Sequence, residues 1–228
     1  MKFIRKLLII LLILLLLAGT FIFLIGYGYY SNTLHEKSLT ARAEEITSKE
    51  HFVSFDQLSE NYINAVIAVE DHRYYEHGPV DFIGIARALY TNIRDGKFDE
   101  GGSTITQQVA KNVIFNQEKT LIRKVGEIFG AYDLEKNYTK NEIFALYVNS
   151  SYFGDGYYCI YDASMGYYNK EPKDLTLAEA SMLAGIPNAP SVYSPSVNLD
   201  LAKKRQKHVL SKMVEYGYIT QEEANNVY

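Results

Sequence analysis

The sequence predicts a mainly α protein in which one N-terminal membrane-spanning helix precedes a single helical domain. Three observations favour this fold class: an apolar run near the N-terminus, a series of segments with helical spacing of apolar residues, and no convincing alternating strand pattern. The 228 residues leave roughly 190 for a domain after the anchor, which is enough to bury a core.

The composition narrows the class of function. The formal net charge is −4, so the chain lacks the strongly basic footprint of a nucleic-acid-binding protein, and we expect no nucleic acid among its partners. The single cysteine, Cys159, cannot form an internal disulfide, and we expect it to be a small buried residue.

The N-terminal apolar run extends from Leu7 to Ile25 and is long enough to span a hydrocarbon core of about 30 Å. Lys2, Arg5 and Lys6 precede it, so the positive-inside rule places the N-terminus in the cytoplasm and the remainder outside. A cleaved signal peptide is the alternative, but the run is longer than a usual signal core and no small-x-small cleavage site follows it. We therefore expect four segments: a cytoplasmic N-terminus over 1–6, the anchor over 7–25, a juxtamembrane stalk over 26–50 and the domain over 51–228.

Helix-start signals recur along the domain. Ser59 is placed to cap a helix that continues through Val69. Apolar residues from Phe82 to Ile93 have the spacing of a buried helix, and those from Leu121 to Tyr132 are expected to point inward. Three capping boxes, in which a hydroxyl and a carboxylate satisfy each other's backbone amides, begin later helices: Thr139 with Glu142, Thr176 with Glu179, and Thr220 with Glu223.

The stretch from Val69 to Asn112 combines residues suited to chemistry. Glu70 follows a strongly apolar helix, which would partly desolvate its carboxyl, the setting of a proton-transfer group. Asp71 beside it would repel a second negative charge or bind a cation. An acidic pair on a solvated helix end is the alternative interpretation. His77 lies in a turn before Asp81, which we expect to cap the next helix.

A glycine pair precedes a second polar helix start. Gly101 and Gly102 permit close approach of another group, and the first-turn amides of the helix that follows favour an anion. Lys111 lies on the polar side of this helix and adds a positive charge. An ordinary capped helix with one core face remains the alternative. Arg123 and Glu127 share a face of a later helix, either as a surface ion pair or as a lining of the same cleft.

Several other motifs are absent from the chain. It contains no H-E-x-x-H metal motif, no G-x-S-x-G elbow and no phosphate loop ending in G-K-S/T. It also lacks the S-x-x-K serine motif of a penicillin-binding transpeptidase. Together with the end at Tyr228, this favours a monofunctional enzyme over one fragment of a bifunctional protein.

Three strings of residues resemble motifs of the peptidoglycan glycosyltransferases, which include the monofunctional transglycosylases and the glycosyltransferase module of class A penicillin-binding proteins. Glu70 to Gly78 resembles E-D-x-x-F-x-x-H-x-G with Tyr74 in place of Phe, Gly101 to Gln108 is similar to the second motif, and Arg123 to Glu127 fits R-K-x-x-E. The resemblance runs from about Phe52 to Tyr228.

Two further strings resemble the fourth and fifth motifs more weakly. The string from Ile143 to Asn149 resembles I-L-E-x-Y-L-N, but Ala145 stands where the family has Glu, and Cys159 stands at a usual Gly. Arg205, followed by a Val-Leu pair, resembles R-x-x-x-V-L. The missing Glu removes a salt bridge or a cleft contact, which would affect the rate.

The resemblance implies a lysozyme-like α fold and an enzyme that polymerises lipid II into β-1,4 glycan strands with inversion and release of undecaprenyl pyrophosphate. Glu70 would be the general base and Glu127 the second catalytic carboxylate. The resemblance admits a divalent cation, Mg²⁺ or Mn²⁺, held by Glu127 or Asp71, and no tightly bound cofactor. Substrate-binding residues are expected in all three motifs: Asp71, Tyr74, His77, Ser103, Thr104, Gln107, Gln108, Lys111, Asn112, Arg123 and Lys124.

The expected partners are lipid II, the growing glycan strand, the membrane and other cell-wall synthesis proteins, and the expected location is the bacterial cell membrane with the catalytic domain outside. The segment from Tyr90 to Glu100, with Phe98 between charges, is expected to be a mobile flap or a piece that dips into lipid. Two alternatives remain open: a lysozyme-like enzyme that cleaves glycan, and a membrane-anchored scaffold with impaired catalysis.

Overall fold

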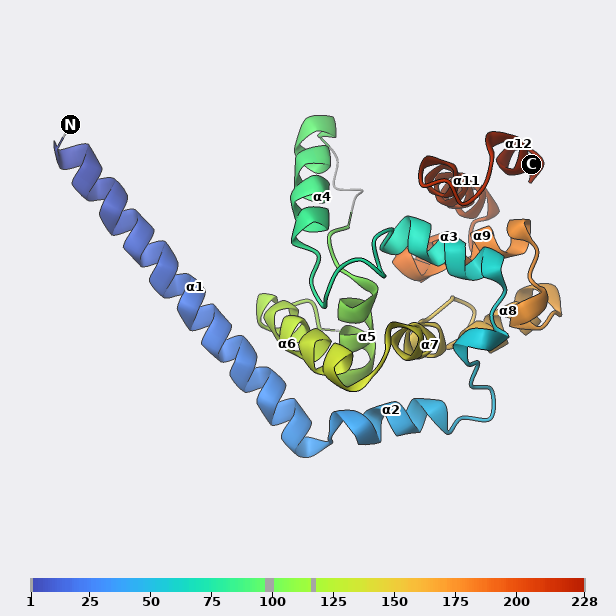
Figure 1. Cartoon of the computed structure of the whole chain (residues 1–228), viewed down its shortest axis with the longest axis horizontal. Coiled ribbons are helices and arrows are strands. Elements are labelled where there is room, and N and C mark those ends of the chain that lie inside the picture. Colours follow the sequence, from blue (N-terminus) through green and yellow to red (C-terminus); the bar gives the residue numbers. More distant parts are fainter. Residues whose placement is uncertain (1, 97–100, 116–117, 228) are drawn as a thin grey trace.

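A computed structural model describes residues 2–96, 101–115 and 118–227 (Figure 1). These residues form α-helices and short 3-10 helices and contain no strand, which confirms the mainly α prediction. The helices of the first half are α1 (Lys2–Glu36), α2 (Leu39–Thr47), η1 (Phe55–Gln57), α3 (Glu60–Glu70), α4 (Phe82–Asp95), α5 (Ile105–Ile114) and α6 (Leu121–Asn137). Those of the second half are α7 (Lys140–Ser150), α8 (Ile160–Tyr168), η2 (Pro172–Asp174), α9 (Leu177–Gly185), η3 (Ile186–Asn188), α10 (Pro190–Tyr193), α11 (Leu199–Glu215) and α12 (Gln221–Asn225).

Helix α1 is the single N-terminal apolar helix that the sequence predicts. Its most apolar window has a mean hydropathy of 3.3, and none of that window is buried inside the protein. By length and composition the helix is able to cross a membrane. Its 35 residues extend about 52 Å at 1.5 Å per residue, well beyond an apolar layer of about 30 Å. Figure 1 shows the N-terminal part standing away from the domain and the C-terminal part reaching it.

The segment over 26–50, predicted as a juxtamembrane stalk, is mostly helical and partly buried. It contains the last turns of α1 and all of α2, and Leu39, Ala43 and Ile46 of α2 are buried. Helix α2 lies against α5 and α7. Burial of this apolar stripe makes α2 a part of the domain's core.

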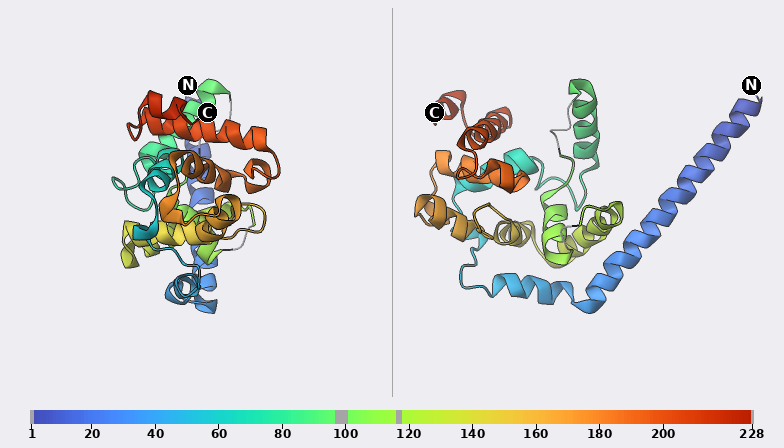
Figure 2. Two further views of the ribbon diagram at one scale, coloured as in Figure 1. Left: turned by 90° about the vertical axis from the view of Figure 1, so that its right-hand side faces the viewer. Right: turned by 180° about the vertical axis from the view of Figure 1, so that it is seen from behind.

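The core surrounds α5 and α3. Helix α5 packs between α6 and α7, while α3 packs against α9 and α11. Large aromatic side chains fill the space between these helices, and Tyr62, Tyr74, Phe144 and Tyr147 are almost fully buried. Two more views of the same ribbon show α4 and the N-terminal part of α1 projecting from this core (Figure 2).

The local signals for helix starts are confirmed. The Ser59 hydroxyl accepts a hydrogen bond from the Tyr62 amide, and the three predicted capping boxes at Thr139, Thr176 and Thr220 all form. Cys159 is buried as expected and caps α8, where its sulfur accepts from the Asp162 amide. Asp81 precedes α4, but its carboxylate makes no capping bond to α4 and pairs with Arg73.

The prediction of a buried helix over 82–93 was wrong. Helix α4 has the amphipathic pattern, but Phe82, Leu89 and Ile93 are more than half exposed, and only Ala88 is buried among its apolar residues. The apolar spacing correctly predicts a helix, but no described element covers its apolar stripe. Residues 97–100 of the expected flap, including Phe98, lie outside the described residues.

The inward face predicted for α6 was also wrong. Leu121 and Tyr132 are exposed, while the face toward α5 and Phe115 carries Gly126 and Gly130. A Cβ on Gly130 would lie 2.7 Å from an Ile114 side-chain carbon, so the two helices pack too closely for larger residues there. Val125 and Phe129 pack against α1 instead.

Candidate active site

A cleft of about 260 Å³ opens where α3, α5, α6 and α11 converge. Eight of the predicted site residues line it, including both predicted catalytic carboxylates: Glu70, Asp71, Ser103, Gln108, Lys111, Arg123, Lys124 and Glu127. Its lysine and arginine lining residues are Arg87, Lys111, Arg123, Lys124, Arg205 and Lys212. Six cations against three carboxylates make the cleft suitable for an anionic ligand.

Glu70 is the last residue of α3, and its side chain is mostly enclosed. One carboxylate oxygen accepts a hydrogen bond of 2.8 Å from the Gln108 amide. The other, Oε1, is buried and has no hydrogen-bond partner within the described residues, and Arg205 Nη2 lies 3.5 Å from it. A carboxylate with an unused acceptor at a cleft wall is suited to take a proton from a bound hydroxyl.

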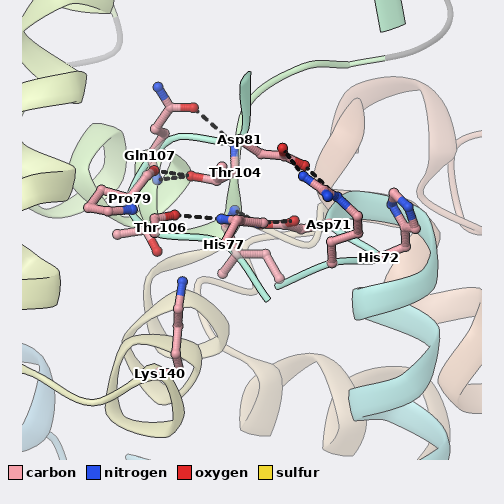
Figure 3. Close-up of polar contacts among 12 residues, drawn as sticks. Asp71, His72, His77, Pro79, Asp81, Thr104, Thr106, Gln107 and Lys140 are labelled. Carbon is pink, nitrogen blue, oxygen red and sulfur yellow. Dashed lines mark hydrogen bonds and ion pairs between the residues drawn. The ribbon is translucent and has the colours of Figure 1, made fainter. Parts of the chain in front are cut away.

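Asp71 has a different environment from its neighbour. Its Oδ1 lies 2.6 Å from Nε2 of His77, and its Oδ2 accepts from the Ile105 amide at the start of α5. Burial lowers the pKa of His77, but the hydrogen bond and charge of Asp71 outweigh it and raise the pKa overall. Asp71 therefore joins the end of α3 to the beginning of α5, and Figure 3 shows this cluster beside Thr104 and Pro79.

The α6 side of the cleft is a compact charge cluster. Glu127 is 1% exposed; one of its oxygens accepts from Arg123 Nη1 and the other from Lys124 Nζ at 2.8 Å. Lys124 also donates to the Ser103 hydroxyl at 2.6 Å, which ties α6 to the turn after the glycine pair. Glu127 thus holds two cations at the cleft wall.

Lys111 lies on α5 between the two sides. Burial lowers its pKa below the ordinary value of 10.5, and the neighbouring Arg123 and Lys124 act in the same direction against the raising effect of Glu127 and Glu70. A partly desolvated ammonium surrounded by like charges is stabilised by binding an anion. The predicted convergence of Lys111 with the Arg123 cluster is therefore present.

Five predicted substrate-binding residues do not line this cleft. Tyr74 is fully buried and donates to the Lys140 carbonyl, and Gln107 forms a capping box with Thr104. The Thr104 hydroxyl donates to the carbonyl of Pro79, the residue after the first motif string. The remaining two are His77, which is held by Asp71, and Asn112.

Sequence reasoning assigned no role in the site to Arg87 or His72 and named Arg205 only through the weak fifth motif. Arg205 and Arg87 come from α11 and α4, far apart in the chain. Arg87 Nη1 lies 2.7 Å from Nε2 of His72, whose ring stacks on Tyr216 at 4.2 Å. Burial, followed by the charges of Arg87 and Arg73, lowers the pKa of His72, which favours a neutral ring that accepts from Arg87. Only the folded chain brings Arg87 and Arg205 to Glu70.

The residues suggested for a divalent cation are already engaged. Both oxygens of Glu127 face positive side chains, and both oxygens of Asp71 accept hydrogen bonds. Asp71, His77 and Asp81 offer ligand atoms within 4.8 Å of one another, but Asp81 pairs with Arg73. This arrangement does not fit a metal ion without displacing those partners.

The departure at Ala145 lies away from the cleft. Ala145 is 4% exposed and lines a separate cavity of about 350 Å³ with Phe52, Phe55 and Leu146. None of the cleft residues lines that cavity. The absence of a Glu at this position therefore leaves the charged lining of the cleft unchanged.

Comparison with known proteins identifies a family match over residues 36–214, to the transglycosylase family. The chain is 41% identical over 240 residues to penicillin-binding protein 1F of Bacillus subtilis (strain 168), covering 97% of this chain and 33% of that protein. It is 48% identical over 172 residues to penicillin-binding protein 1A of Neisseria lactamica, covering 75% of this chain and 22% of that protein. The chain thus spans a third or less of the length of these relatives.

Among solved structures, the crystal structure of penicillin-binding protein 1A from Haemophilus influenzae matches with a TM-score of 0.38 and 27% sequence identity. The match covers 54% of this chain and 15% of that chain.

Proposed function

The chain belongs to the transglycosylase family, the peptidoglycan glycosyltransferases, and from that premise we propose that it polymerises lipid II into β-1,4 glycan strands at the membrane surface. The observation that carries this proposal is the shared cleft. In it the Glu70 carboxylate, one oxygen of which accepts no hydrogen bond within the described residues, faces the cations of α5 and α6. A sugar diphosphate needs both a base for the incoming hydroxyl and positive charge for the leaving group.

In the proposed reaction, Glu70 accepts the proton of the acceptor sugar's 4-hydroxyl. The freed oxygen attacks the anomeric carbon of the donor, a new glycosidic bond forms with inversion, and the bond to the pyrophosphate oxygen breaks. Undecaprenyl pyrophosphate leaves with the electron pair. Lys111, Arg123 and Lys124 stabilise the negative charge that develops on it. Glu127 keeps the two α6 cations in place.

The anchor fits a lipid-linked substrate, because an enzyme held at the bilayer meets such a substrate in two dimensions. We propose that the N-terminus is cytoplasmic, as Lys2, Arg5 and Lys6 indicate, and that the domain faces outward with the growing strand. Other cell-wall synthesis proteins are proposed partners at that surface.

The direct test is polymerisation of labelled lipid II by the full-length chain in detergent, beside Glu70→Gln. Loss of a general base costs about 10²- to 10⁴-fold in rate, and we expect a decrease in this range with folding intact. Glu60→Gln is the matched control, because Glu60 is an exposed glutamate at the other end of α3. Glycan cleavage instead of polymer formation, or full activity of Glu70→Gln, would contradict the proposal.

A further inference from the structure

The part of α1 nearest the domain packs along the outer side of α6. The ring of Phe129 on α6 is surrounded by three aromatic rings of α1: Phe23, Tyr27 and Tyr30, with centroids 4.8, 5.2 and 5.9 Å away. Tyr30 also donates a hydrogen bond of 2.6 Å to the Asp133 carboxylate, one turn farther along α6. The contact therefore combines aromatic packing with a directional polar bond.

The same two helices come closest at Gly26. This glycine is buried, and a Cβ placed on it would lie 2.5 Å from Cγ1 of Val125 and 2.7 Å from its Cβ. Any larger residue at position 26 must push α1 and α6 apart. A small residue at a close helix crossing is the usual device for packing two helices tightly near or within a membrane. Gly28, by contrast, has no atom within 4 Å of such a Cβ.

Helix α6 carries the cation cluster on the side opposite to this contact. With 100° of rotation per residue, Val125 and Phe129 share one face, while Arg123 and Glu127 point roughly the other way. The third side of α6 meets Ile114 and Ala110 of α5 through Gly130, and meets Phe115, just after α5, through Gly126. Helix α6 is thus held between α1 and α5. A close-packed interior transmits strain, so a shift at the α1 contact would reach the cleft wall.

We propose that the outer turns of the anchor helix position Arg123 and Lys124 in the cleft, so that α1 sets the geometry of the anion site as well as attaching the domain to the membrane. Gly26, Phe129 and Tyr30 are positioning residues in this arrangement and do not touch the substrate. The catalytic part of the inference rests on the proposed function, whereas its anion-binding part does not.

The test uses full-length protein in detergent with the membrane helix intact. Gly26→Val places a branched side chain against Val125, and Gly28→Val, the matched control, places the same side chain in open space. The double variant Gly26→Val with Val125→Gly exchanges the two residues and restores room at the crossing. Each protein is measured for lipid II polymerisation, as kcat and KM, and for affinity for inorganic pyrophosphate by calorimetry.

A displacement of the binding groups by about 1 Å costs on the order of 10²-fold, so we expect Gly26→Val to lower kcat/KM by between tenfold and that amount and to weaken pyrophosphate binding in parallel. Gly28→Val should match the wild type, and the exchange variant should recover both measurements. Tyr30→Phe, which removes only the bond to Asp133, should give a smaller loss in the same direction.

Equal pyrophosphate affinity for Gly26→Val and Gly28→Val would overturn the inference. So would a Gly26→Val defect that the exchange variant does not relieve, because the loss would then come from unfolding and not from the crossing. A wild-type protein that binds pyrophosphate but makes no polymer would contradict the proposed function alone, and the binding series would still decide whether α1 positions α6.

Discussion

On the α6 side of the cleft, Glu127 is enclosed by Arg123 and Lys124, whereas on the α3 side Glu70 accepts one hydrogen bond and keeps a second oxygen without such a bond. The first carboxylate is a fixed negative charge whose work is to hold cations. The second is an acceptor still available to a ligand. The same functional group therefore serves two purposes because the surrounding donors differ.

Removing a cation from the α6 side of the cleft should lower activity more than the other variants described below. Lys124→Ala removes one of the cations at Glu127, and we expect kcat/KM for lipid II to fall about 10²-fold, the cost of losing one electrostatic contact to a developing charge. Lys136→Ala, an exposed lysine at the far end of α6, is the control. An unchanged rate in Lys124→Ala would show that this side does not hold the leaving group.

The pH dependence of kcat/KM tests the role of Lys111 on the cationic side of the cleft. Because burial lowers its pKa, its ammonium loses its proton at a lower pH than an ordinary lysine, and kcat/KM should fall as pH rises through that value, below 10.5. Lys111→Arg keeps its charge at every accessible pH. This variant should move the alkaline limb upward. A limb that does not move would assign it to another group.

Asp71 offers the comparison within the acidic pair itself. Asp71→Asn removes a buried charged acceptor from His77, and we expect the free energy of unfolding to fall by about 2 kcal/mol. Glu70→Gln should leave stability nearly unchanged. Chemical denaturation in detergent measures both, with exposed Glu76→Gln as the control. Equal stability of the Asp71 and Glu70 variants would show that the Asp71 carboxylate does not stabilise the fold more than the Glu70 carboxylate does.

The smallest expected effect is the pH dependence of the stability that the contact between His77 and Asp71 provides. The His77 pKa is raised in the folded protein, so protonated His77 adds stability that is fully present below its unfolded pKa of about 6.5 and is lost as pH rises through the folded value. Thermal unfolding temperatures across this window should therefore decline in the wild type relative to His77→Gln. Parallel curves for the two proteins would argue against a charged His77.

The sequence predicts best what is decided by neighbours in the chain. The capping boxes at Thr139, Thr176 and Thr220 form because their partners lie three residues away. The meeting of Glu70 with Lys111 and Arg123 was also anticipated, but from three separate motifs and a family resemblance, not from periodicity.

Other features depend on what covers a surface, which periodicity does not specify. The stripes of α4 and α6 were both assigned to the core. No described element covers the α4 stripe, and the α6 stripe meets α1 at Phe129 but is exposed at Leu121 and Tyr132. Tyr74 was expected in the site because of its place in a motif, but its ring fills the core. Arg87 was missed because only the fold brings it near Glu70, whereas the weak match at Arg205 was a usable signal.

The solitary thiol of this chain makes it a convenient subject for spectroscopy. Burial raises the pKa of Cys159 to about 11, so at neutral pH almost none of it is thiolate, and only the thiolate reacts readily with alkylating labels. A reporter cysteine introduced on α1 or α6 would then be modified selectively without first deleting the native one. Movements of these helices can be followed in an otherwise unaltered polypeptide.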